Sequence, residues 1–204
     1  MIERYTLPEM GKIWTDTYKL QTWLDVEIAV CEAQAELGYI PQAAVDEIKT
    51  KAKFDPQRVL EIEAEVRHDV IAFLTNVNEY VGDAGRYIHL GLTSSDVLDT
   101  ALALQLVASL DLILEQLEKL IQAIRYQAQQ HRYTVMVGRS HGIHAEPITF
   151  GFKLAGWLAE VLRNRDRLVR VAQSIAVGKI SGAVGTYANI DPKVEAIACQ
   201  KLGL

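Results

Sequence analysis

The chain of 204 residues is half hydrophobic and 23% charged, a balance that is typical of a folded globular protein and excludes a disordered one. Its net charge of -5 makes it a poor candidate for binding nucleic-acid backbones, which requires a basic surface. Two distant cysteines (Cys31 and Cys199), a start without an apolar leader and the lack of any run of eighteen apolar residues predict a cytoplasmic protein with free thiols, no secretory signal and no membrane span.

Helix-type periodicity runs through almost the whole chain, and no convincing strand alternation accompanies it, so the sequence predicts an all-α fold. Helices are expected at about 18–37, 41–53, from 56 onward and at 69–81, before several glycines interrupt the pattern. These helices make up a predicted amino-terminal helical domain, residues 1–92.

Two long helices are expected in a second predicted domain, residues 93–204. Residues 95–130 contain neither Gly nor Pro, which gives a helix of roughly 50 Å, and its middle is apolar around much of its circumference. Another long helix is expected from Pro147, a residue favoured in a first turn, to about Val177, and a last one after Pro192. Two such helices cannot cover one another's apolar faces, so the bundle is incomplete in this chain or is completed by other chains.

The segment GLTSSD (91–96) stands where the first long helix begins. Thr93, Ser94 and Ser95 are all good N-cap residues, so one interpretation is simply a capped helix. The alternative is an anion site, because a helix start offers free N–H groups and a positive dipole end, to which the hydroxyls add donors.

The segment GRSHGIHAEP (138–147) lies between the two long helices and is rich in polar side chains. The simplest interpretation is a polar loop. A metal site made by His141, His144 and Glu146 is a second, although the Gly and Pro residues keep the two His from sharing a helical face. A third is an acid/base histidine, since imidazole has the unperturbed pKa nearest to neutral pH.

Other candidate residues lie in similar polar segments. RHDV (67–70) places a cation, an imidazole and a carboxylate side by side. Four of the five histidines of the chain lie in or beside such segments: His68, His89, His141 and His144. Their clustering favours a functional site. The Gly-rich stretch GKISGAVGTY (178–187) does not have the spacing of a Walker phosphate loop and is interpreted as a connection between helices.

Together, five strings resemble the adenylosuccinate lyase family, a branch of the fumarase/aspartase superfamily, in order and spacing: RYTLPEM, RHDV, HLGLTSSD, GRSHGIHAEPITFG and GKISGAVGTYANIDP. The resemblance covers essentially the whole chain and is to the amino-terminal portion of the family. It implies an amino-terminal helical domain followed by the first long helices of a truncated fumarase/aspartase-type bundle. Argininosuccinate lyase, fumarase and aspartase are the nearest rivals, and the first, second and fourth strings favour the adenylosuccinate branch.

The resemblance also implies an activity. Fumarate is eliminated from adenylosuccinate, giving AMP, and from the succinyl-carboxamide ribotide of purine biosynthesis. No metal or organic cofactor is expected, and the substrate is a small purine nucleotide. The implied assembly is a homotetramer whose active sites are shared between subunits, with no nucleic-acid or membrane partner.

Site residues follow position by position from the resemblance. His141 matches the general acid that protonates the leaving nitrogen, and His68, with Asp69, matches the pair beside the base and that nitrogen. The implied substrate-binding residues are Thr93 and Ser94 for the succinyl carboxylates, and Arg4, Tyr5 and His89 near the phosphate. Arg139, Ser140, His144 and Thr186 are near matches without an assigned role.

One departure concerns the catalytic base. In the family, a serine on a mobile loop reading roughly Ser-Ser-x-Met-Pro-x-Lys-x-Asn-Pro removes the proton, and no such string occurs in these 204 residues. We therefore expect little or no lyase activity from this stretch by itself. A non-catalytic helical oligomerisation module is the alternative from another class, and binding of AMP that depends on His68 or Arg4 separates the two.

Overall fold

The computed structural model describes residues 2–204 and divides into two compact units. Unit 1 comprises the chain up to Ala108 together with Ile175–Leu204, and unit 2 is Ser109–Ser174. The predicted all-α class is confirmed, with one small two-stranded sheet as an addition. The predicted domain boundary between residues 92 and 93 is a different division and stays a prediction.

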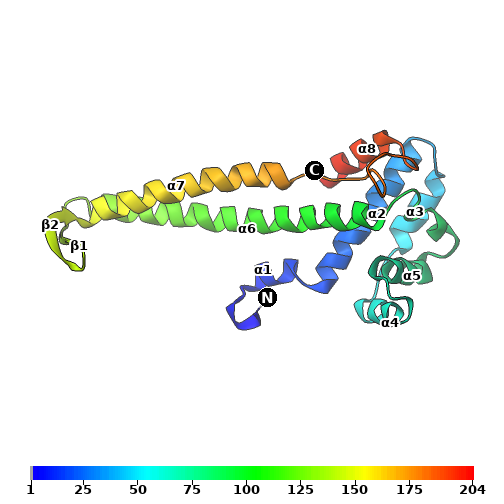
Figure 1. Ribbon diagram of the computed structural model, residues 1–204, viewed down its shortest axis with the longest axis horizontal. Coiled ribbons are helices and arrows are strands. Elements are labelled where there is room, and N and C mark those ends of the chain that lie inside the picture. Colours follow the sequence, from blue (N-terminus) through cyan, green and yellow to red (C-terminus); the bar gives the residue numbers. More distant parts are fainter. Residues whose placement is uncertain (1) are drawn as a thin grey trace. The chain divides into compact units, whose positions relative to one another are not determined.

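Unit 1 is built from short and medium helices (Figure 1). Its elements are η1 (Glu3–Tyr5), α1 (Pro8–Ile13), α2 (Asp16–Glu36), α3 (Gln42–Lys51), α4 (Pro56–Val66), α5 (Asp69–Val81), η2 (Gly82–Tyr87), the first part of α6 (Ser94–Gln130) and α8 (Pro192–Leu202). Several helices begin where an N-cap side chain accepts a backbone N–H, as Asp55 does for α4 and Asp191 for α8. Both of these caps precede a proline at the first helical position, which is why the sequence predicts the two helix starts correctly.

Helix α2 is buried on more than one face and organises the core of unit 1. On one side Trp23 meets Phe73 of α5 edge to face, with ring centroids 5.5 Å apart, and Phe73 is fully buried. On another side Ala33 packs in a second cluster with Val194 and Ala198 of α8. Because α2 is covered by both α3–α5 and α8, polar residues along it are buried as well. Some of these polar side chains contact the loop that carries the candidate site.

Unit 2 is a helical hairpin that carries a β-hairpin at its tip (Figure 1). The rest of α6 leads into β1 (Val135–Ser140) and β2 (Ile143–Thr149), which pair antiparallel, and α7 (Phe150–Ile175) returns. The predicted helix start at Pro147 is wrong: Pro147 pairs with Val137 in the sheet, and the helix begins at Phe150. A β-bulge beside Gly138 and an edge position accommodate the proline, which cannot donate to a ladder.

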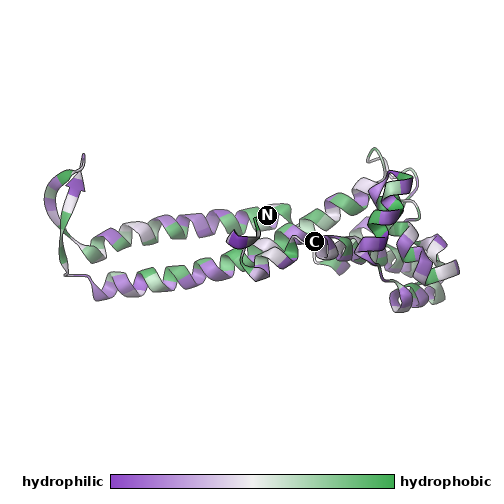
Figure 2. Ribbon diagram, turned by 90° about the horizontal axis from the view of Figure 1, so that it is seen from below, coloured by the Kyte–Doolittle hydropathy of each residue, from purple (hydrophilic) through white to green (hydrophobic). Residues whose placement is uncertain are grey.

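Apolar residues recur along both long helices, α6 and α7 (Figure 2). Large exposed apolar side chains within unit 2 include Ile113, Leu120, Trp157 and Val169, all more than 40% exposed. This agrees with the expectation that the two long helices do not cover one another's apolar faces. By length and mean hydropathy α6 could also cross a membrane, and a third of the 18-residue window that meets these criteria is buried in the structure. A single helix of this kind is weak evidence for a membrane span, because the core helix of a globular bundle meets the same criteria.

Candidate functional site

Three side chains on one face of α2 hold the backbone of residues 87–90. Glu27, Cys31 and Gln34 are spaced four and three residues apart, so they share that face. The Gln34 amide donates to the carbonyl of residue 90 at 2.8 Å, and the Cys31 thiol contacts the carbonyl of residue 87 at 3.6 Å. Burial, followed by the charges of two nearby glutamates, raises the pKa of Cys31 to about 12, so this thiol stays protonated and structural.

Glu27 makes the closest of these contacts, and it makes two of them with a single residue. One carboxylate oxygen accepts the backbone N–H of His89 at 2.9 Å, and the other lies 2.6 Å from the imidazole Nδ1. His89 has a φ of 66°, a left-handed conformation in which His is enriched, and Glu27 is only 1% exposed. Sequence reasoning missed Glu27, because nothing within a helix indicates a partner 62 residues away.

The N-terminus of α6 follows the loop at 87–90 in the chain. Thr93 is the last residue before the helix, and its backbone N–H donates to the carboxylate of Asp96 at 2.9 Å, as in a capping box. Within residues 2–204 the hydroxyls of Thr93 and Ser94 make no hydrogen bond to the protein, and both residues are half-buried. The start of α6 is therefore capped by the Asp96 carboxylate. The hydroxyls of Thr93 and Ser94 beside it remain free to donate to a ligand.

Asp96 also anchors the Gly-rich stretch 178–187 to this helix start. It is fully buried and accepts hydrogen bonds from the Lys179 ammonium at 2.7 Å and from the backbone N–H groups of Ser181 and Gly182 at 3.1 Å. Lys179 in turn exchanges backbone hydrogen bonds with the Thr100 hydroxyl, one turn further along α6. The Thr-x-x-Asp spacing of a capping box was the available sequence signal for Asp96.

The same stretch is fastened to α8 and packs closely against residues 88–93. Glu195 accepts from the backbone N–H of Ile180 and from the Tyr187 hydroxyl, both at 2.7 Å. A Cβ on Gly91, whose φ is 78°, would lie 2.5 Å from the backbone oxygen of Asn189. The backbones of the two loops, 88–93 and 178–191, therefore pack against each other at a distance that only glycine allows.

His68 and Asp69 stand at the start of α5. His68 is its N-cap, and its Nδ1 lies 3.4 Å from both the Ile71 backbone N–H and the Asp69 carboxylate. A neutral ring caps the helix by accepting at Nδ1, whereas a protonated ring pairs with Asp69 instead. The His68 and Asp69 side chains are 41% and 51% exposed, so this His–Asp pair is open to a ligand.

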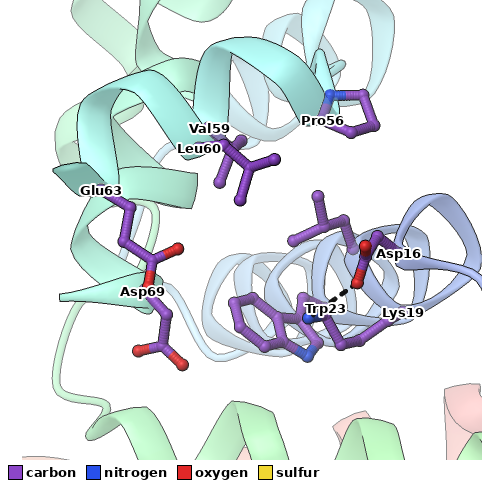
Figure 3. Close-up of a pocket in the computed structure, with 9 residues that line it drawn as sticks. Asp16, Lys19, Trp23, Pro56, Val59, Leu60, Glu63 and Asp69 are labelled. Carbon is purple, nitrogen blue, oxygen red and sulfur yellow. Dashed lines mark ion pairs between the residues drawn. The ribbon is translucent and has the colours of Figure 1, made fainter.

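A shallow cleft of about 50 Å³ reaches Asp69 from between α2 and α4 (Figure 3). Its walls include the apolar side chains of Leu20, Trp23, Val59 and Leu60. Three carboxylates, Asp16, Glu63 and Asp69, line it against a single cation, Lys19, which pairs with Asp16 at 3.3 Å. This sign of charge does not suit a phosphate or a dicarboxylate, so the cleft is not the anion site.

His141 lies in unit 2, at the turn of the β-hairpin. His141 and Gly142 have φ values of 51° and 76°, and their neighbours Ser140 and Ile143 pair, which defines a two-residue turn with a type I′ backbone. His141 is exposed, as are Arg139 and His144, which face each other in the ladder. His141 is thus presented on a tight turn, and the interpretation of 138–147 as a polar loop is wrong, because most of this segment lies in two paired strands.

The remaining predicted residues are Arg4 and Tyr5. They lie in η1, exposed, with the Arg4 guanidinium 4.8 Å from the centre of the Tyr5 ring. No contact within residues 2–204 joins them to the α6 start. Unit 1 thus brings His89, Thr93 and Ser94 together, while His68 and Asp69 form a separate pair on α5. In the described part of the chain, no group of three or more His, Cys, Asp or Glu side chains could hold a metal ion.

Comparison with known proteins gives the class first. A family model described as Lyase matches residues 3–204. The chain therefore belongs to this lyase family. Solved structures agree: the fold is similar to 3-carboxy-cis,cis-muconate lactonizing enzyme from Pseudomonas putida (TM-score 0.91, 35% identity, 98% of this chain and 48% of that one). It is similar also to a fumarate lyase from Mesorhizobium sp. BNC1 (TM-score 0.90, 31% identity, 96% and 48%).

Relatives with higher identity narrow the class. Over its full length of 204 residues the chain is 54% identical to adenylosuccinate lyase of Bacillus subtilis (strain 168), and it is 50% identical to that of Aquifex aeolicus (strain VF5) over 207 aligned positions. These relatives are C–N lyases, so the predicted resemblance is confirmed. The chain spans about half the length of the curated relatives it matches, 47% in both cases.

Proposed function

We propose that this chain forms part of an adenylosuccinate lyase, which eliminates fumarate from adenylosuccinate to release AMP and acts in the same way on the succinyl-carboxamide ribotide of purine biosynthesis. The 54% identity to the Bacillus subtilis enzyme along the whole chain carries the proposal. The order of its site segments and the unengaged hydroxyls at the α6 start support it. The proposed location is the cytoplasm, and the reaction needs no metal or organic cofactor.

The elimination breaks one C–H bond and one C–N bond of the succinyl group. A base takes the proton beside a carboxylate, so negative charge builds on that carboxylate in the transition state. Hydroxyl donors and a helix N-terminus interact more strongly with this developing charge than with the carboxylate of the bound substrate. They therefore stabilise the transition state more than the ground state, which is what catalysis requires. We assign this role to Thr93 and Ser94 at the start of α6.

The leaving nitrogen must gain a proton as its bond to carbon breaks. A histidine can supply that proton near neutral pH, and we assign the step to His141, with the His68–Asp69 pair beside the same nitrogen. The proposed contacts to the phosphate are Arg4, Tyr5 and His89. Because the phosphate lies far from the reacting bond, its binding energy orients the substrate.

His141 and the α6 start lie in different units, and apolar side chains are exposed along α6 and α7. Both observations favour a homotetramer whose active sites combine residues from several subunits. The base is proposed to come from a serine-bearing loop that these 204 residues do not contain. The 204-residue stretch prepared by itself is therefore expected to show little or no turnover.

Complementation tests the proposal. The chain is assayed for fumarate release from adenylosuccinate, alone and mixed with a full-length Bacillus subtilis adenylosuccinate lyase in which the histidine equivalent to His141 is replaced. We expect no activity from either alone and activity from the mixture. A second partner lacking the loop serine as well is the control, and it must stay inactive in the mixture. Turnover by the 204-residue chain alone, or activity with the second partner, contradicts the assignment of the base.

A further inference from the structure

We propose that Glu27 is a positioning residue that holds His89 as a proton-carrying, anion-binding side chain beside the α6 start, where it receives a phosphate monoester. The inference rests on the proposed function for the identity of the ligand. It adds a residue on α2 that none of the five sequence strings contains.

A single buried carboxylate fixes both the backbone and the side chain of His89. Its two oxygens lie 2.9 Å from the backbone nitrogen and 2.6 Å from Nδ1. Glu27 is 1% exposed, and a carboxylate buried to this degree is costly unless it is hydrogen-bonded and charge-compensated. No lysine or arginine pairs with it within residues 2–204, so a protonated His89 is the compensating cation.

The same contact decides what the other ring nitrogen can do. Because Nδ1 faces a carboxylate acceptor, it carries its proton in both charge states of the ring. Nε2 is then an acceptor when the ring is neutral and a donor only when the ring is protonated. In the described part of the chain Nε2 has no hydrogen-bond partner, and the side chain is 21% exposed. His89 can therefore donate to an anion at Nε2 only as the imidazolium.

The charges that surround the ring favour that form. Burial is the largest single influence and opposes protonation, but the hydrogen bond to Glu27, the charge of Glu27 and the charge of Asp96 outweigh it, and the pKa of His89 is raised. Glu27 faces the ring from α2, whereas Asp96 acts from α6 and is itself paired with Lys179 at 2.7 Å. Glu27 is thus the group whose negative charge is available to His89.

The position of His89 in the chain suits an anion. The left-handed φ of His89 and the glycine at 91 bring the chain round to Thr93 within four residues. An imidazolium, a helix N-terminus and two unengaged hydroxyls thus occupy one short segment. The two hydroxyls and the helix start are already assigned to the succinyl carboxylates, so the imidazolium of His89 is the donor that remains for a phosphate monoester, which is dianionic near neutral pH.

The test follows the ring of His89 by NMR in the full chain, with its signals assigned by their loss in H89Q. Two variants make the same chemical change on one helix: E27Q removes the partner of His89, and E36Q, at an exposed residue that pairs with Lys201, is the control. In the wild type and in E36Q we expect a titration above the ordinary pKa of 6.5 and, at high pH, nitrogen shifts of the Nδ1–H tautomer. In E27Q we expect the pKa to fall and the tautomer preference to be lost.

Inorganic phosphate and AMP are then titrated separately. We expect phosphate to perturb the His89 signals in the wild type and to bind about tenfold more weakly to E27Q at pH 7, the equivalent of one charge-assisted hydrogen bond. An unshifted wild-type titration, or equal phosphate binding by E27Q, overturns the inference even if E27Q folds poorly, because the first result needs no variant. If phosphate binds at His89 but AMP does not bind, the role of Glu27 and His89 is supported. The proposal that the substrate is a purine nucleotide is then contradicted.

Discussion

The two units differ in how they hold their candidate residues. In unit 1, His89 and the α6 start are fixed by buried carboxylates, Glu27 and Asp96, each with several hydrogen bonds. In unit 2, His141 stands on an exposed two-residue turn with no comparable support from the rest of that unit. The difference teaches that the surroundings of His89 are prepared within one chain, whereas His141 receives no such surroundings from its own unit, which is why we propose that other chains supply them.

Removing the carboxylate of Asp96 should produce the largest effect. In D96A the Lys179 ammonium loses its partner, and the backbone N–H groups of Ser181 and Gly182 lose their acceptor. Lys179 is 37% exposed, so the loss comes chiefly from the hydrogen bonds to the buried carboxylate, which contribute about 1.5–3 kcal/mol each. We expect the unfolding free energy, read from urea denaturation, to fall by about 3–5 kcal/mol. A loss below about 1 kcal/mol means that this carboxylate does not stabilise unit 1. The proposed contrast between a supported site in unit 1 and an unsupported turn in unit 2 is then wrong.

A pair of glycines in α7 tests unit 2 in the same way. A Cβ on Gly151 would lie 2.5 Å from the backbone oxygen of Ala128, whereas nothing lies within 4 Å of one on Gly156. We expect G151A to destabilise the chain by about 1–3 kcal/mol. G156A, in contrast, should be neutral or stabilise by up to about 1 kcal/mol through helix propensity. Equal effects of the two substitutions in denaturant titrations contradict the close crossing of α6 and α7.

The smallest expected effect is a pH dependence of stability that comes from His89. Its pKa is raised in the folded chain, so the folded state binds this proton more tightly than the unfolded state. The stabilisation is fully present below the ordinary value of 6.5 and is lost as the pH rises through the raised value. Unfolding free energies measured across this range should therefore fall for the wild type and for E36Q, and change less for E27Q. The same slope in all three proteins removes Glu27 as the cause.

Most helices could be predicted because their signals are local. The helix at 69–81 was predicted with the bounds that α5 has, and the Asp-Pro pairs mark the starts of α4 and α8. The sequence does not predict the β-hairpin, because its strands are short and Pro147 is a residue type that favours a helix start. A His-Gly pair is a weaker turn signal than Asn-Gly, although His also tolerates a positive φ.

Only part of the candidate site could be predicted from the sequence. His89, Thr93 and Ser94 came from a family resemblance that recognises strings of neighbouring residues. Glu27 lies in a helix with no such string, and its partner is fixed only when α2 packs against the loop at 87–90. Asp96 was inside a recognised string, but its contacts with 178–187 depend on the loop returning to the α6 start. Long-range contacts of this kind carry no periodicity and cannot be read from one sequence.

The most direct test of the account is the rate of fumarate release when this chain is mixed with the full-length relative that lacks the His141 equivalent. H141N is compared with the wild type, because Asn also adopts a positive φ and should preserve the turn. We predict that the wild-type mixture releases fumarate and that H141N lowers the rate by about 10²–10⁴-fold, as expected for a lost general acid, while unfolding curves of the two chains coincide. An equal rate for H141N contradicts the assignment of His141 as the acid supplied by this chain.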